Sequence, residues 1–343
     1  MRPVRVGVWG VGAWGEKHAR VYESLDESDL VGVHDLSADR AREVAGRHHC
    51  RAFATPDAMV RECEAISVTV PTVAHRAALE RAVSAGCHVI VEKPMAPAVE
   101  DADAMLLAAG RAGVQLQVGH VERFNPALLA ARPHVQVPKF IEAHRLALFQ
   151  PRSLDIDVVF DLMIHDVDVV LDAVGVPPVS VSAVGVAVLS ENEDIANARL
   201  EFADGCVANL TASRVSQERL RRVRFFQGDA YLSVDLLEKT CEMLRVGPRE
   251  GAPAPPPGAA PADPSTAAAL AGLFATFRRR RLEVEPGEPL ALELRAFLTS
   301  LRGRGPGAAT GEAGRAALQV AAEVRAAMKR RAQQWTARPS PVS

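Results

Sequence analysis

Residues 4–15 read VRVGVWGVGAWG, and this stretch decides the fold of the first part of the chain. An apolar strand runs directly into Gly10, Gly12 and Gly15, which are spaced as G-x-G-x-x-G before a helical segment. The first glycine permits a tight turn, the second lets the backbone approach a pyrophosphate, and the third allows close helix packing. The pattern predicts a Rossmann domain that binds a dinucleotide at the N-terminus of its first helix, beside Ala13 and Trp14.

Asp35 lies twenty residues after Gly15, at the end of the second predicted strand. A carboxylate at this position can accept hydrogen bonds from the adenosine ribose of NAD. The 2′-phosphate of NADP would instead meet a negative charge, with only Arg40 nearby to compensate it. The expected cofactor is therefore NAD.

The first 122 residues alternate short apolar strands with helical stretches, as βαβ units around a parallel sheet do. The predicted strands are 4–9, 30–35, 65–70, 88–92 and 115–119. The predicted helices are 15–25, 37–49, 56–62, 72–85 and 99–112. Residues 1–122 are thus expected to form an α/β Rossmann domain.

The remaining chain predicts a second domain, 123–335, of α+β type with a largely antiparallel open sheet. Its predicted strands are 140–148, 179–189, 196–202, 206–213 and 221–226. Its predicted helices are 158–174, 289–301 and 314–335. Residues 252–264, APAPPPGAAPADP, predict a surface loop because proline interrupts helices and central strands, and residues 336–343 predict a tail.

The overall composition gives no sign of a nucleic-acid or membrane partner. The 343 residues carry a formal net charge of -2, and no run is long and apolar enough to span a bilayer. The start has no secretory signal pattern, so a cytoplasmic protein is expected. The five cysteines lack metal-ligand spacing, so neither a metal site nor a disulfide framework is expected.

Residues 88–94, HVIVEKP, end an apolar strand with a lysine at the carboxyl edge of the predicted sheet. Ligands bind at this edge in open α/β folds. The ammonium of Lys93, near a bound nicotinamide, can polarise the reacting oxygen or relay a proton. Read alone, however, Lys93 is more simply a surface charge.

Residues 161–168, DLMIHDVD, place four ionisable groups, one histidine and three aspartates, in an apolar helical stretch. Asp161, His165 and Asp168 stand at i, i+4 and i+7, so a regular helix puts them on one stripe. A histidine oriented by a carboxylate can act as a general base toward a substrate hydroxyl. The alternative is a core histidine with structural carboxylates.

These motifs together resemble the glucose-fructose oxidoreductase, inositol dehydrogenase and MocA (Gfo/Idh/MocA) family, in order along nearly the whole chain. The motifs are GVWGVGAWG at 7–15, Val70-Pro71-Thr72 with His75, Glu92-Lys93-Pro94, and Asp161 with His165. The resemblance implies a catalytic set of Lys93, Asp161 and His165, and it implies cofactor contacts from Val70, Pro71, His75, Glu92 and Lys93. It also implies a homodimer or homotetramer. Met163 stands where many members of the family have glycine, and it is expected to narrow the pocket beside the substrate.

A narrower resemblance rests on VGHVERFNP at 118–126 and RVRFFQGDAYLSVD at 222–235. It points to members that oxidise the 3-hydroxyl of UDP-N-acetylglucosamine for a partner aminotransferase in lipid A or surface-polysaccharide synthesis. His120, Arg123 and Asn125 would then offer donors to the sugar, together with Lys93, Asp161 and His165. Arg123 is alternatively a domain-interface ion pair. A dehydrogenase of a free sugar or polyol and a non-catalytic NAD-binding regulator are the alternative functions.

A local basic cluster comprises Arg219, Arg221, Arg222 and Arg224. Strand alternation places Arg222 and Arg224 on one face, and a diphosphate could use that face. A solvated strand edge or a subunit contact explains the cluster equally well. Residues 278–281, RRRR, predict a solvated turn.

Overall fold

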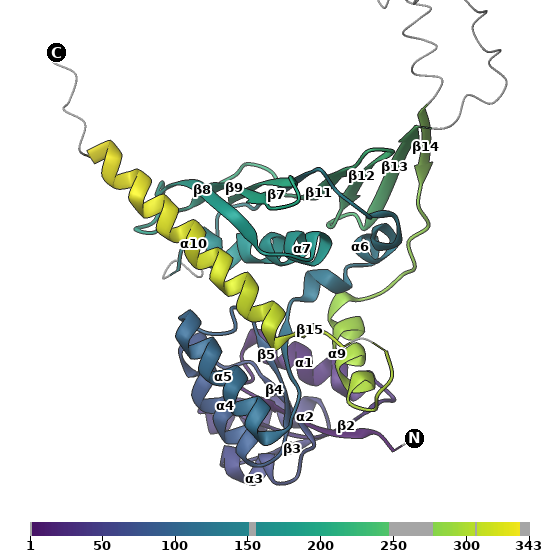
Figure 1. The fold of residues 1–343 in the computed structure, drawn as a ribbon. Coiled ribbons are helices and arrows are strands. Elements are labelled where there is room, and N and C mark those ends of the chain that lie inside the picture. The colour runs from purple at the N-terminus through teal and green to yellow at the C-terminus, as the bar shows by residue number, and fades with distance from the viewer. Residues whose placement is uncertain (1, 151–155, 247–276, 306, 337–343) are drawn as a thin grey trace, which may run out of the picture.

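A computed structural model describes residues 2–150, 156–246, 277–305 and 307–336 of the chain. Two sheets lie one above the other, and the long helix α10 (Gly311–Thr336) runs past both of them (Figure 1). The predicted loop 252–264 and residues 337–343 of the predicted tail lie outside the described residues. Within them, no helix is long and apolar enough to cross a membrane.

The first sheet has seven strands in the order β15-β6-β5-β4-β1-β2-β3, all parallel except β15. Its strands are β1 (Val4–Trp9), β2 (Ser28–His34), β3 (Arg51–Ala52), β4 (Ala65–Val68), β5 (His88–Glu92), β6 (Leu116–Gly119) and β15 (Ala309–Thr310). Its helices are α1 (Ala13–Ser24), α2 (Ala38–Arg47), α3 (Pro56–Val60), the 3-10 turn η1 (Thr72–Ala74), α4 (His75–Ser84) and α5 (Val99–Ala112). The predicted Rossmann fold is confirmed.

Local sequence explains where these elements begin and why they are buried. Val6 and Val8 of β1 are fully buried, as expected for a parallel strand with helices on both faces. The Ser37 hydroxyl caps α2 by accepting from the Arg40 amide, and the Thr55 hydroxyl caps α3 in the same way. Each cap satisfies a backbone donor that the helix itself leaves unpaired.

The second sheet has eight strands in the order β14-β13-β12-β11-β7-β10-β9-β8, and only β7 and β10 are parallel neighbours. Its strands are β7 (Phe140–Leu146), β8 (Pro178–Val186), β9 (Ile195–Phe202), β10 (Val207–Ser213), β11 (Leu220–Phe226), β12 (Ala230–Asp235), β13 (Thr240–Val246) and β14 (Phe277–Arg281). The predicted, largely antiparallel sheet is confirmed. The predicted turn at 278–281 is wrong, because those arginines form the edge strand β14.

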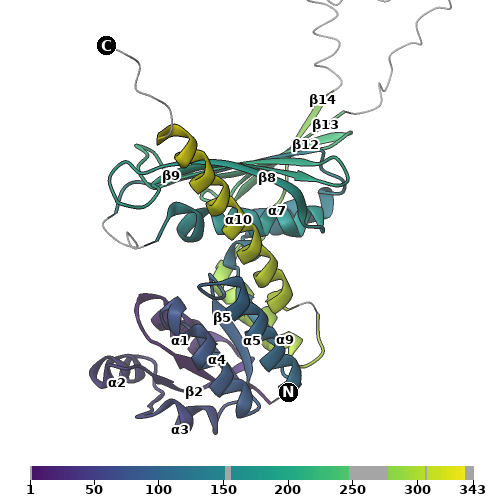
Figure 2. The same ribbon diagram turned by 60° about the vertical axis from the view of Figure 1, so that its left-hand side comes forward.

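Short helical elements lie between the two sheets (Figure 1). They are the 3-10 turn η2 (Val121–Phe124), α6 (Pro126–Ala131), the 3-10 turn η3 (Arg132–His134), the π-helical turn η4 (Val159–Met163) and α7 (Ile164–Val174). Figure 2 shows α7 on the side of the second sheet that faces the first. These helical elements therefore form a layer between the two sheets.

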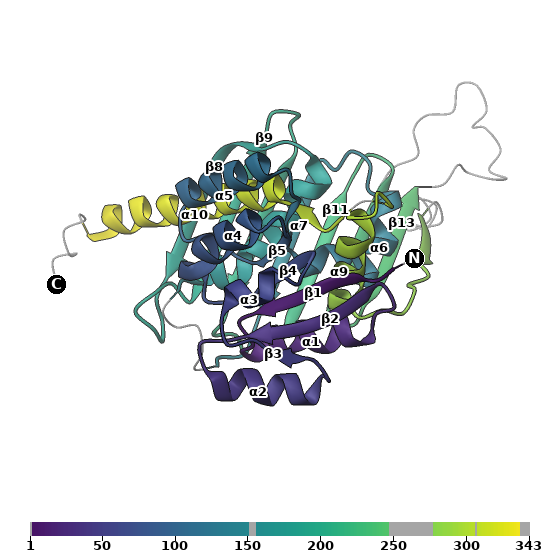
Figure 3. The same cartoon turned by 90° about the horizontal axis from the view of Figure 1, so that it is seen from below.

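The chain returns to the first sheet after building the second. Helix α9 (Pro289–Ser300) places Leu294 and Phe297 in one core cluster with residues of β1 and α1. Strand β15 then hydrogen-bonds to β6 before α10 begins. Figure 3 shows α9 beside the strands of the first sheet. Residues 289–310 were predicted with the second domain but lie with the first sheet. The apolar side chains of α9 pack against its core, and the backbone of β15 hydrogen-bonds to β6.

Candidate active site

The glycine turn after β1 leaves open space where a pyrophosphate would lie. Gly10 adopts a φ of +91°, and a Cβ at Gly15 would stand 1.9 Å from the Gly10 carbonyl oxygen. A Cβ at Gly12, in contrast, would have no heavy atom within 4 Å. Gly10 and Gly15 therefore shape the turn, whereas Gly12 keeps the backbone accessible at the start of α1.

Asp35 is held at the end of β2 by the turn itself. Its Oδ2 accepts the Val11 amide at 2.8 Å. The one arginine expected nearby is already engaged, because Arg40 donates to the Val11 carbonyl at 2.8 Å and pairs with Glu16 and Glu43 at 2.5 and 2.9 Å. A 2′-phosphate would thus meet a fixed carboxylate beside an arginine whose charge is balanced.

His75 ties together two loops at the carboxyl edge of the first sheet. It is buried, and its two ring nitrogens lie 2.9 Å from the Val70 carbonyl and 3.3 Å from the Met95 carbonyl. Burial lowers the pKa of His75 below its ordinary value, despite these two contacts. His75 consequently supports the loop of Val70 and Pro71 rather than presenting its ring nitrogens to a ligand.

Glu92 holds the backbone of the loop that carries Lys93. Its Oε1 lies 3.0 Å from His18 Nε2, and its Oε2 accepts the Lys93 amide at 3.2 Å. Burial alone would raise the pKa of Glu92, but the hydrogen bond from His18, with the His18 charge and the Trp14 hydrogen bond, lowers it overall. The carboxylate stays ionised and holds the loop that carries Lys93.

The side chain of Lys93 contacts the helical turn that precedes α7. Its Nζ donates to the backbone carbonyl of Asp161 at 2.7 Å. Asp161 lies in the π-helical turn η4, where the Ile164 amide reaches back five residues to the Val159 carbonyl. The regular helix predicted at 158–174 therefore starts with a wider turn, which alters the expected i, i+4 stacking of Asp161 on His165.

His165 occupies the first turn of α7 and is half-buried. Its Nδ1 is buried and has no hydrogen-bond partner among the residues that the structure describes. Burial lowers the pKa of His165 well below its ordinary value, and the positive charges of Lys93 and Arg145 lower it further. The imidazole is therefore neutral at neutral pH and can accept a proton.

The three residues predicted to bind substrate from segment 120–125 differ in their surroundings. Arg123 forms a bidentate ion pair with Asp168, with both distances 2.7 Å, so its guanidinium is already engaged. Asn125 caps α6, since its Oδ1 accepts the Ala127 amide at 3.1 Å. His120 is buried without a hydrogen-bond partner among the described residues, and its Nε2 lies 3.8 Å from Asp168 Oδ1.

Arg145 is a central residue of the site that sequence reasoning missed. It is 2% exposed and donates twice to Asp166, at 2.9 and 2.8 Å, and once to Glu122, at 2.8 Å. The pair fixes the residue next to His165. A signal existed in β7, where Ile141, Ala143 and Arg145 alternate on the buried face, because an arginine there requires buried partners.

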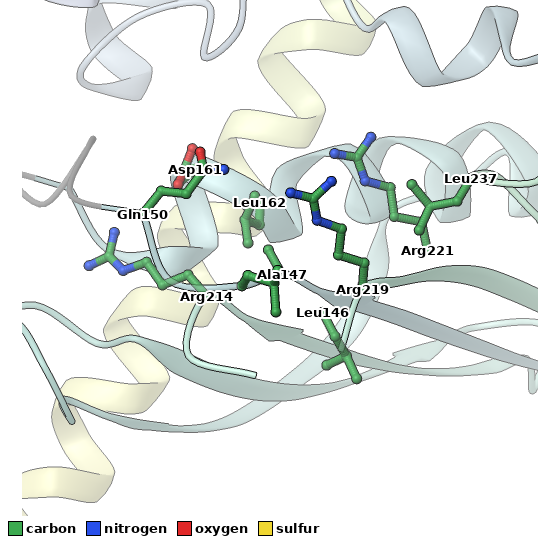
Figure 4. A pocket seen from close by; sticks show the side chains of 10 residues that line it. Leu146, Ala147, Gln150, Asp161, Leu162, Arg214, Arg219, Arg221 and Leu237 are labelled. Carbon is green, nitrogen blue, oxygen red and sulfur yellow. The ribbon is translucent and has the colours of Figure 1, made fainter. Parts of the chain in front are cut away.

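A pocket opens beside Asp161, and its polar walls come from Gln150, Arg214, Arg219 and Arg221 (Figure 4). The predicted use of the Arg222 and Arg224 face is not supported. Arg222 pairs with Asp235 at 2.9 Å and Arg224 with Glu142 at 2.8 Å. The part of the basic cluster that meets the pocket is Arg219 and Arg221.

Within residues 2–150, 156–246, 277–305 and 307–336, no group of three or more His, Cys, Asp or Glu side chains is arranged to hold a metal ion. Four of the five cysteines, Cys63, Cys87, Cys206 and Cys241, are buried free thiols, and Cys50 is partly buried.

Two family models match the sequence. Residues 4–120 match the model described as "Oxidoreductase family, NAD-binding Rossmann fold". Residues 140–229 match the model described as "GFO/IDH/MocA C-terminal domain". The two matches fall on the first sheet and on the greater part of the second.

One relative extends this similarity to nearly the whole chain, and another matches a shorter part of it. The UDP-N-acetylglucosamine 3-dehydrogenase of Acidithiobacillus ferrooxidans is 40% identical over 327 residues, which cover 95% of this chain and 97% of that protein. A solved structure of that enzyme has a TM-score of 0.84 at 38% identity, covering 96% of this chain and 99% of the other. Inositol 2-dehydrogenase of Rhizobium meliloti is 27% identical over 62% of this chain and 69% of that protein.

Proposed function

Since the chain belongs to the GFO/IDH/MocA family of NAD-binding oxidoreductases, we propose that it oxidises the 3-hydroxyl of UDP-N-acetylglucosamine to a ketone. The observation that carries this proposal is the 2.7 Å hydrogen bond from Lys93 Nζ to the Asp161 carbonyl. The bond joins the cofactor edge of the first sheet to the helix of His165. The full-length identity of 40% to a UDP-N-acetylglucosamine 3-dehydrogenase supports the choice of substrate.

The first sheet offers the groups that would hold NAD. The backbone at Gly12 is open, and the start of α1 supplies amides toward a pyrophosphate. The Asp35 carboxylate is placed for the adenosine ribose, and the loop of Val70 and Pro71 follows β4 at the same edge. NAD bound there supplies the hydride acceptor for the oxidation.

Lys93 and His165 divide the proton chemistry between them. The neutral imidazole of His165 accepts the proton of the substrate hydroxyl. The ammonium of Lys93, oriented by the Asp161 carbonyl, donates a hydrogen bond to the same oxygen and stabilises the negative charge that develops as the proton leaves. In the reverse direction, the imidazolium returns the proton to that oxygen.

A substrate panel tests the proposal directly. Purified protein with NAD is given UDP-N-acetylglucosamine, free N-acetylglucosamine, myo-inositol or glucose, and NADH absorbance is followed with 2-oxoglutarate and a coupled aminotransferase to remove the ketone. We expect NADH only with the UDP-sugar. NADH from a free sugar or polyol would retain the dehydrogenase chemistry but reject this substrate. No NADH with any substrate, despite NAD binding, would favour a non-catalytic regulator.

The pH dependence of the same reaction tests the role of His165. A base must be unprotonated to accept a proton, and the pKa of His165 is lowered well below its ordinary value of 6.5. We therefore expect kcat/KM to stay constant as the pH falls to 6.5 and to decline only below it. A decline that is already complete above pH 6.5 would exclude His165 as the base.

Assembly and location belong to the same proposal. A homodimer or homotetramer is supported by apolar side chains exposed along and after β8, such as Val179 at 69% and Leu189 at 60% exposure. A cytoplasmic location is also proposed, because NAD and a UDP-sugar are both available in the cytoplasm. Light scattering of the purified protein measures its molar mass and so gives the number of subunits.

A further inference from the structure

The pocket beside Asp161 has a basic wall that the oxidation chemistry does not use. Figure 4 shows Arg219 and Arg221 pointing from the sheet toward the helical turn that carries Asp161 and Leu162, with Arg214 also lining the pocket. Hydride and proton transfer from a hydroxyl need a base and an oxygen-stabilising cation, which His165 and Lys93 supply. The arginines therefore call for a different explanation.

The three arginines differ in how their charges are balanced. Arg214 is buried and donates to Asp194 and to the Ile156 carbonyl, both at 2.8 Å. Arg221 lies 3.4 Å from Glu122. Arg219 is exposed and has no hydrogen-bond or ion-pair partner among the residues that the structure describes. Arg219 is thus the cation that an incoming anion can engage without breaking an existing ion pair.

The pocket adjoins the proposed site of oxidation through a single residue. Asp161 contributes to the pocket wall and also accepts the Lys93 ammonium on its backbone carbonyl at 2.7 Å. A single ligand can therefore place its reacting hydroxyl at Lys93 and an anionic group in the pocket, provided that only a short stretch of covalent structure separates the two groups. In a nucleotide sugar, one pyranose ring separates the 3-hydroxyl from the diphosphate.

We propose that this pocket binds the diphosphate of the sugar nucleotide, with Arg219 as the main contact and Arg221 as its neighbour on the same wall. This inference rests on the proposed function and adds the group by which a nucleotide sugar is distinguished from a free sugar. A planar guanidinium offers paired N–H donors to phosphate oxygens, and such charge-assisted hydrogen bonds are stronger than neutral ones. Arg219 is accordingly a specificity-determining residue.

Arg222, three residues after Arg219, provides a matched control. Arg222 stands on the opposite face of β11 and pairs with Asp235 at 2.9 Å, so it lies outside the pocket. Calorimetric titration of the NAD-loaded protein with UDP, inorganic pyrophosphate and uridine measures binding without turnover. We expect Arg219→Gln to weaken UDP and pyrophosphate binding about tenfold. Uridine binding should not change, and Arg222→Gln should match wild type.

Kinetics with the UDP-sugar give a second readout. Arg219→Gln should raise KM about tenfold with little change in kcat, and Arg219→Lys, which keeps the charge but loses the paired donors, should lie between it and wild type. Equal binding of UDP by wild type and Arg219→Gln, or no binding of UDP and pyrophosphate by wild type, would overturn the pocket assignment.

The two proposals fail separately. If UDP binding depends on Arg219 but no UDP-sugar yields NADH, the pocket assignment stands and the proposed function falls. If UDP-N-acetylglucosamine yields NADH with the same KM in wild type and Arg219→Gln, the proposed function stands and the pocket assignment falls.

Discussion

The glycine turn at residues 10–15 and the helical segment at 158–168 present their functional groups differently. The turn uses backbone amides and the space left by a missing side chain at Gly12. The helical segment uses ionisable side chains that other parts of the chain hold in place, such as Arg145 on Asp166. The groups that the first region presents are close together in the sequence, whereas the side chains of the second region are held by ion pairs with residues far along the chain.

This difference teaches how the two regions should respond to substitution. A site made of backbone amides has no buried charge of its own, so it does not depend on a buried ion pair for its stability. A site of buried charges loses both stability and chemistry when one partner is removed, because the remaining charge has no solvent to compensate it. Changes in the helical segment should therefore leave NAD binding intact.

The largest effect should come from removing the proposed proton-handling groups. Lys93→Ala and His165→Ala should each lower kcat by about 10²–10⁴-fold, the usual contribution of a positioned acid or base. Stopped-flow or steady-state NADH formation measures the loss, and fluorescence titration measures NAD affinity, which should not change in His165→Ala because His165 lies in the helical segment. A near-normal rate in either variant would remove that residue from the proposed mechanism. A loss of NAD affinity in His165→Ala would show that NAD binding also depends on the helical segment.

A smaller effect, on stability, should come from the buried ion pairs. Arg145→Ala leaves Asp166 and Glu122 buried without their cation and should cost about 3–5 kcal/mol of unfolding free energy. The matched control is Arg224→Ala, whose partly exposed pair with Glu142 should cost about 0–1 kcal/mol. Urea unfolding followed by circular dichroism compares them. Similar losses for both arginines would show that the burial of the Arg145 network does not matter.

The smallest effect should come from the cofactor edge. Asp35→Asn removes the negative charge but keeps an oxygen for the Val11 amide. Use of NADP should improve about fivefold relative to NAD, because two charges a few ångströms apart in water interact by about 1 kcal/mol. The ratio of kcat/KM for the two cofactors measures this. An unchanged ratio would mean that Asp35 does not select the cofactor.

The parts of the fold that follow from local sequence were predictable. The strand, the three glycines and Asp35 lie within one βαβ unit, so their spacing alone indicates their arrangement. The caps Ser37 and Thr55 are equally local. The lysine at the end of β5 was also predictable, because a parallel strand delivers its last residues to the ligand-binding edge.

The remaining features depend on which segments become neighbours. The pairing of Arg145 with Glu122 and Asp166 depends on β7, η2 and α7 meeting, although an arginine on a buried strand face was a usable signal. The pocket position of Arg219 depends on the direction of the chain just before β11. The two-residue strand β15 has no local pattern, so its pairing with β6 could not be predicted.

The return of the chain to the first sheet also sets an order of events during protein synthesis. When the ribosome has released only the first 122 residues, the β6 edge and the apolar surface that Leu294 and Phe297 later cover are still open. The NAD-binding half therefore waits for nearly the whole polypeptide before it is complete. Until then the nascent chain exposes apolar surface to which chaperones can bind. If translation stops while the strands of the second sheet are being made, neither sheet can be completed.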